Sequence, residues 1–227
     1  MSFLKKKHTA IAGFTLVELM VAIGIYILMA ALLFANQNKF NSSLAFSNLG
    51  YDIALTIRQA QTYGFAVRGE NSGSTVAFTN AFGVHFQGDS PSKFQLFYEP
   101  IQGLLGATNP TPQPYDQSSN TTVLSTYNLQ NNYTISALCY NPNNKCGQTT
   151  DISSGTCDPV STSGSSAKYL DIIFQRPNLN AFMFNSAGPI SQQVAIELES
   201  PQGEKECVSV FASGDIEVGT STAPSPS

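Results

Sequence analysis

Residues that could carry out chemistry are few in this chain, and they form no familiar catalytic pattern. Beyond the first ten residues the only histidine is His85, which alternates with apolar residues in the string FGVHFQ. This spacing predicts a residue on the surface of a strand rather than a general base. No GxSxG, HExxH or P-loop string occurs. The sequence therefore predicts a protein that is not an enzyme and that needs no cofactor.

Two pairs of carboxylates have the i, i+2 spacing that places side chains on one face of a strand. They are Glu197 with Glu199 and Glu204 with Glu206. Paired carboxylates at a suitable separation are the basis of glycoside hydrolysis, but nothing else here marks such a site. We therefore expect all four to be solvated acids.

The four cysteines are Cys139, Cys146, Cys157 and Cys207, and all follow the apolar N-terminal segment described below. Four cysteines allow three pairings. We expect Cys139 to pair with Cys146 and Cys157 with Cys207, which suits an oxidising compartment. Zinc binding and free thiols are the alternatives, although no CxxC pair supports zinc. A calcium site is not expected either, because Asp151, Asp158 and Asp171 lie in no DxDxDG-like loop.

One further carboxylate, Glu18, is the only charge between residues 14 and 35. As a helix this segment spans about 33 Å, enough to cross a hydrocarbon core of roughly 30 Å. Lys5, Lys6 and Lys7 precede it and only Lys39 follows closely, which predicts a cytoplasmic N-terminus. A carboxylate in a membrane helix costs roughly 2.5 to 3.5 kcal/mol, so Glu18 needs a cationic partner unless it lies at the interface.

A secretory signal peptide is the alternative interpretation of this segment. It requires a small-x-small cleavage site after the apolar run, which instead ends Leu33-Phe34-Ala35. The small residues Ala10, Ala12 and Gly13 lie before the run. A cut there would leave the membrane helix on the mature protein.

The string KKKHTAIAGFTLVELMVAIGI, residues 5 to 25, resembles the class III signal of type IV prepilins and pseudopilins. The resemblance implies a leader of residues 1–13, removed after Gly13 by a prepilin peptidase that also methylates the amine of Phe14. It further implies that Glu18 of one subunit pairs with the Phe14 amine of its neighbour in a filament. The implied partners are other pilin or pseudopilin subunits, the peptidase and an inner-membrane assembly platform.

The membrane segment, residues 14–35, lacks the late proline found in many major pilins, since it ends ILMAALLFA. This difference favours pseudopilins and minor subunits. Residues 36–68 should continue the helix as an amphipathic half, and IRQAQTYGFAVRGENSG resembles the helix end of H-type minor pseudopilins. The face expected to pack on a sheet is spaced by three and four residues and comprises Phe46, Leu49, Ile53, Ile57, Ala60, Gly64 and Val67.

Residues 69–218 should form a β-rich domain, and 219–227 (GTSTAPSPS) a disordered tail. Residues 170–219 resemble the C-terminal half of the H-type pseudopilin domain, with Gly214 in the closing hairpin. The fold class expected is therefore α+β, a type IV pilin fold with a long N-terminal helix on antiparallel sheet. The expected strands, whose spacing fits meanders, are 74–79, 82–87, 93–98, 121–127, 132–138, 169–175, 181–184, 193–198, 205–211 and 215–218.

Composition and charge bear on two alternative functions. Charged residues are 11% of the 227, less than half of a globular average of about 25%, which favours an exported protein. From Phe40 onward 7 basic residues stand against 14 acidic ones, a net charge of −7. Because phosphate binding needs clustered cations, this disfavours a DNA-uptake pilin. An anchored surface-binding protein would be marked by exposed aromatic residues, for which Tyr115, Tyr127 and Tyr140 are the candidates.

Overall fold

The structure is a computed structural model of the chain. It describes residues 15–66, 70–72, 75–77, 80–100, 112–115, 121–140, 157–160, 168–178 and 180–221. The chain divides into two compact units, Met1–Leu44 and Ala45–Ser227. One helix, α1, runs from Leu16 to Phe65, and no proline interrupts it.

In the first unit, α1 carries an apolar stretch from Leu16 to Phe34 that is long and apolar enough to cross a membrane. None of this stretch is buried within the chain. A secretory signal would pass the same test of length and composition. The side chains that are exposed here therefore need an apolar environment other than the protein's own core.

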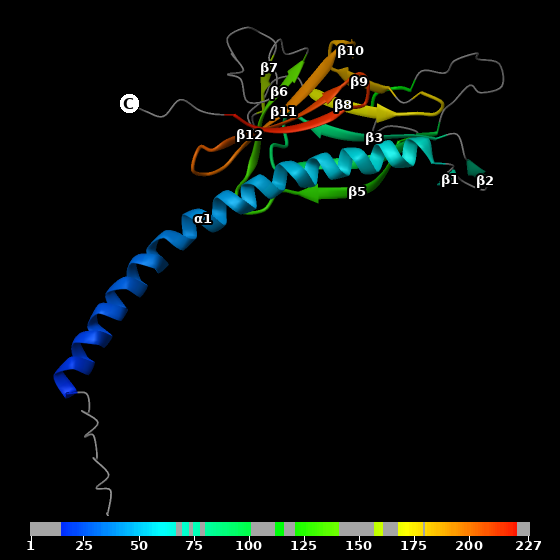
Figure 1. Ribbon diagram of the computed structural model, residues 1–227. Coiled ribbons are helices and arrows are strands. Elements are labelled where there is room, and N and C mark those ends of the chain that lie inside the picture. Colours follow the sequence, from blue (N-terminus) through cyan, green and yellow to red (C-terminus); the bar gives the residue numbers. More distant parts are fainter. Residues whose placement is uncertain are drawn as a thin grey trace, which may run out of the picture. The chain divides into compact units, whose positions relative to one another are not determined.

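The second unit contains two sheets and a small hairpin, in which every strand pairing is antiparallel. The hairpin is β1 (Glu70–Ser72) with β2 (Thr75–Ala77). The six-stranded sheet has the order β10-β9-β8-β3-β4-β5, and the five-stranded sheet β13-β12-β11-β6-β7. Figure 1 labels most of these strands. The α+β class predicted from the sequence is confirmed.

Each predicted strand overlaps an observed one, and three observed strands were not predicted: β1, β7 and β10, each of three residues. The strand β13 also reaches Ser221, beyond the predicted end at 218. The bounds of the larger strands are β3 Asn80–Gln87, β4 Lys93–Pro100, β5 Thr122–Asn128, β6 Thr134–Tyr140, β8 Tyr169–Phe174, β9 Ala181–Asn185, β11 Gln193–Glu199, β12 Lys205–Phe211 and β13 Ile216–Ser221; the short ones are β7 Cys157–Pro159 and β10 Gly188–Ile190.

The sheets are built from meanders joined by two long-range pairings. The runs β3-β4-β5, β8-β9-β10 and β11-β12-β13 each pair consecutive strands, as the sequence predicts. The pairs β3 with β8 and β6 with β11 then unite segments far apart in the chain. The predicted turn glycine between β12 and β13 is confirmed, since Gly214 has φ +91° and lies in the connecting turn.

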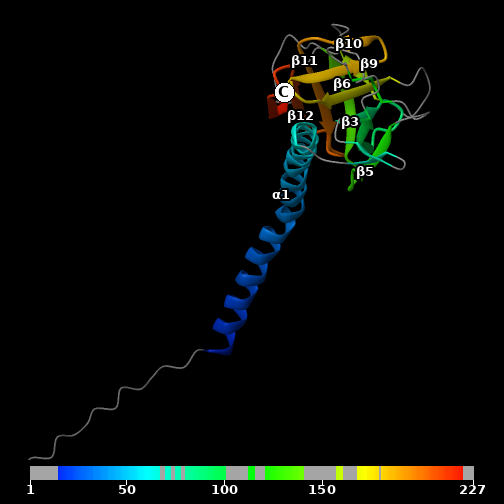
Figure 2. The same ribbon diagram turned by 90° about the vertical axis from the view of Figure 1, so that its right-hand side faces the viewer.

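The second unit has one main core, to which α1 and both sheets contribute. From α1 come Phe46, Ile53, Ile57 and others of the predicted face, of which Leu49 is partly buried and Val67 lies outside the described residues. Residues such as Val84 and Ile172 from one sheet and Ile196 and Val208 from the other complete it. Within this unit, Figures 1 and 2 show the cyan part of α1 running beside the strands.

Two glycines let α1 approach the sheets closely. A Cβ atom at Gly64 would lie 2.6 Å from the Phe174 carbonyl oxygen on β8, and one at Gly50 would lie 2.7 Å from the Glu206 carboxyl carbon on β12. The two positions are 14 residues apart, close to four turns, and so lie on the same helix face. A glycine inside a helix costs about 1 kcal/mol, which the closer packing offsets.

Candidate functional site

The start of α1 holds the residue that the sequence marks most clearly. Thr15 precedes the helix, and its hydroxyl oxygen accepts a hydrogen bond from the backbone N–H of Glu18 at 3.3 Å. Thr15 is therefore the N-cap, and Glu18, the third helical residue, stands where a capping box places a glutamate. A negative charge in the first turn is also favourable to the helix dipole.

Glu18 therefore has two separable properties. Its position suits helix capping, and its charge lies on an otherwise apolar surface. Its neighbours on the helix are exposed and apolar, and they include Leu16, Val17 and Leu19. Gly13 and Phe14, the residues of the predicted processing site, lie outside the described residues. The predicted pairing between Glu18 and a Phe14 amine therefore stays a prediction.

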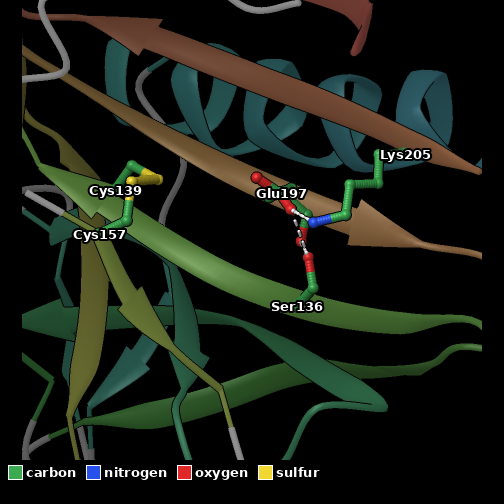
Figure 3. Close-up of a disulfide and its surroundings, with 5 residues drawn as sticks. All are labelled: Ser136, Cys139, Cys157, Glu197 and Lys205. Carbon is green, nitrogen blue, oxygen red and sulfur yellow. Dashed lines mark hydrogen bonds and ion pairs between the residues drawn. A yellow bond between two sulfur atoms is a disulfide. The ribbon is translucent and has the colours of Figure 1, made fainter. Parts of the chain in front are cut away.

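The disulfide pairing predicted from the sequence is wrong. Cys139 is bonded to Cys157, because β6 and β7 pair antiparallel with these two residues directly opposite one another. Figure 3 shows this bond across the two strands. Cys207 is also disulfide-bonded, and Cys146 lies outside the described residues. The described cysteines are therefore disulfide-bonded and none is a free thiol.

His85 is buried, contrary to the prediction of a surface position. In the pairing of β3 with β8 it stands opposite Asp171, and its Nδ1 lies 2.6 Å from Asp171 Oδ1. The backbone N–H of Tyr115 donates to Asp171 Oδ2 at 2.9 Å, and the Tyr115 ring stacks on the imidazole with 4.1 Å between centroids. The segment 112–115 thus covers this part of the sheet.

Asp171 is the centre of this cluster, since its side chain is fully buried and bonded from two sides. Burial raises the pKa of Asp171, while the hydrogen bonds from His85 and from the Tyr115 backbone act in the opposite direction. A buried carboxylate held in this way fixes the imidazole and the covering segment together. The cluster thus stabilises the tertiary structure. It joins His85 and Asp171, which are 86 positions apart in the sequence.

The prediction of solvated glutamates is wrong for two of the four. Glu197 is buried, accepts a hydrogen bond from Ser136 at 3.0 Å and pairs with Lys205 Nζ at 2.5 Å, as Figure 3 shows. Glu206 is buried beneath α1. Glu199 is partly buried and Glu204 is exposed. The alternation of β12, in which Glu206 shares a face with Val208 and Val210, is the signal that indicates its burial.

The three tyrosines proposed as exposed binding aromatics are all partly buried. Tyr115 stacks on His85, and Tyr127 stacks on Phe94 with 5.0 Å between centroids. Tyr140 lies within β6 and donates a long hydrogen bond to the Tyr169 carbonyl oxygen. These rings are engaged by the fold itself.

Metal binding and likeness to known proteins are the remaining clues to function. Within the described ranges, no three His, Cys, Asp or Glu side chains gather closely enough to hold a metal ion. No protein-family model, curated protein or solved structure matches the chain. The residues and their geometry are therefore the basis for a function.

Proposed function

We propose that the chain is a structural subunit of a type IV pilus-like or type II secretion filament, of the minor pilin or pseudopilin kind. The observation that carries the proposal is the position of Glu18. It is a lone carboxylate at the start of an exposed apolar helix that continues into an α+β domain. Helix capping does not require the charge, since glutamine also suits this position, and in a membrane the charge opposes insertion.

In this proposal the role of each part follows from its chemistry. The leader of residues 1–13 is removed and Phe14 is methylated by a prepilin peptidase. The helix then waits in the inner membrane, with the β-rich domain outside, until Glu18 pairs with the Phe14 amine of a neighbouring subunit. Packing of the apolar side chains of Leu16–Phe34 between subunits supplies the cohesion of the filament.

Two further observations support an exported location for the second unit. The disulfide between Cys139 and Cys157, and the bonded state of Cys207, are suited to an oxidising compartment. The low content of charged residues, 11%, is also unusual for a cytosolic protein. The work of such a subunit is structural, so the proposal includes no catalytic step.

Intact mass measurement tests the processing that this function requires. The protein is expressed with and without a prepilin peptidase and recovered from membranes. With the peptidase we expect a chain that begins at Phe14 and carries one added methyl group, and without it the full-length chain. A product that starts after residue 35 in both hosts would identify an ordinary secretory signal instead.

A further inference from the structure

The side chain of Glu206 is an acid buried between a helix and a sheet. It is 2% exposed, and it lies on the face of β12 that carries the core residues Val208 and Val210. Its Oε2 has no hydrogen-bond partner among the residues that the structure describes. Leaving a buried polar atom unpaired costs about 1 to 3 kcal/mol, and more when the group is charged.

The helix above this acid is shaped to receive it. At Gly50, an added Cβ would lie between 2.7 and 2.9 Å from the carboxyl carbon and both carboxyl oxygens of Glu206. The carboxyl group thus occupies the space that a side chain would take at this position of α1. The contact depends on a glycine at residue 50 and on a side chain as long as glutamate at residue 206.

No described charged group is placed to stabilise a carboxylate at this point. On α1 the buried neighbours of Gly50 are apolar, namely Phe46, Ile53 and Ala54. The residues opposite Glu206 in the adjacent strands are Leu198 on β11 and Thr220 on β13. The charged side chains nearest in sequence are engaged or exposed elsewhere, since Lys205 pairs with Glu197 and both Asp52 and Glu204 are exposed.

We propose that Glu206 is a proton-controlled latch between the beginning of the domain part of α1 and the five-stranded sheet. The neutral acid allows the helix to pack at Gly50, and the carboxylate loosens that packing. This inference rests on Gly50, Glu206 and their surroundings alone, so it holds whether or not the chain enters a filament.

The direction of the pH dependence follows from burial, which raises the pKa of Glu206 to about 7 from an ordinary value of 4.5. A backbone hydrogen bond from Gly50 opposes the shift only in part. Below pH 4.5 the group is neutral in the folded and the unfolded chain. Between 4.5 and 7 the unfolded chain releases the proton first, so stability falls as pH rises. The latch is therefore at full strength below about pH 4.5 and is lost as the pH rises to about 7, above which its contribution no longer changes.

Hydrogen exchange of the full chain in detergent micelles tests this proposal. Exchange of the peptide covering residues 46–54 is measured at about pH 6 and 8.5 and corrected for intrinsic rates. The wild type should lose about tenfold of its protection at the higher pH, because the linked opening equilibrium shifts by that order between about pH 6 and 7. The peptide covering residues 58–65 should change little.

Three variants sharpen the result. In Glu206→Gln and in Glu206→Met, which cannot titrate, protection of residues 46–54 should be independent of pH. Glu204→Gln, which alters an exposed acid two residues away, should behave as the wild type does. The proposal is overturned if wild-type protection is unchanged between the two pH values, or if the loss persists in Glu206→Met. If Glu206→Gln does not fold, Glu206→Met alone tests the proposal.

Discussion

Glu18→Ala is expected to reduce the amount of this protein in sheared filaments by about tenfold or more, while cleavage of the leader after Gly13 proceeds normally. Without the carboxylate the neighbour's Phe14 amine has no counter-charge, an unpaired charge in a membrane helix costs roughly 2.5 to 3.5 kcal/mol, and each 1.4 kcal/mol corresponds to a factor of ten. The alanine variant leaves the partner amine unpaired among apolar side chains. Quantitative immunoblots of the filament and membrane fractions measure the effect.

Glu18→Gln is the matched control, because the structure gives Glu18 a second role. Glutamine also suits the third position of a capping box beside Thr15, but it carries no charge. If the charge is what assembly requires, the glutamine variant should fail as the alanine variant does. Normal filament levels in Glu18→Gln would assign the residue to capping and contradict the ion pair.

Asp171→Ala is expected to destabilise the folded protein by about 3 to 5 kcal/mol, the usual cost of removing one member of a buried pair. It takes away the acceptor of His85 Nδ1 at 2.6 Å and of the Tyr115 N–H at 2.9 Å. The stacked segment 112–115 loses its attachment to the sheet at the same time. Urea unfolding of the full chain in detergent, followed by circular dichroism, measures the change in free energy.

Asp89→Ala is the control for this prediction, since Asp89 is exposed and its hydrogen bond is made to the adjacent Ser90. We expect that variant to stay within about 0.5 kcal/mol of the wild type, as surface substitutions usually do. A loss below about 1 kcal/mol in Asp171→Ala would mean that the buried pair contributes little.

Much of the fold could be predicted because periodicity reports burial directly. Phe46, Ile53 and Ile57 recur at helical spacing, and all three are buried against the sheets. The strands that were missed, β1, β7 and β10, have three residues each, too few to alternate. Such strands form because they hydrogen-bond to a neighbouring strand. The residues of that neighbour lie elsewhere in the sequence, so the short segment alone does not predict the pairing.

The sites were harder to predict, for a related physical reason. Cys139 meets Cys157 through the register of β6 and β7, which the spacing of cysteines does not contain. His85 meets Asp171 through a pairing of strands 86 residues apart. Glu206 is different, since its alternation with Val208 did indicate the core. The general preference of carboxylates for solvent argued against that signal, and here the fold overrides the preference.

The proposed function requires this chain to enter a filament, and its abundance in filaments purified from a host with a filament assembly machinery tests that requirement. Filaments are isolated from the wild type and from a strain without prepilin peptidase and analysed by quantitative mass spectrometry. We expect the chain, beginning at Phe14, in wild-type filaments, and we expect it only in membranes when the peptidase is absent. A chain that stays in membranes while other subunits assemble in the wild type would contradict the proposed function.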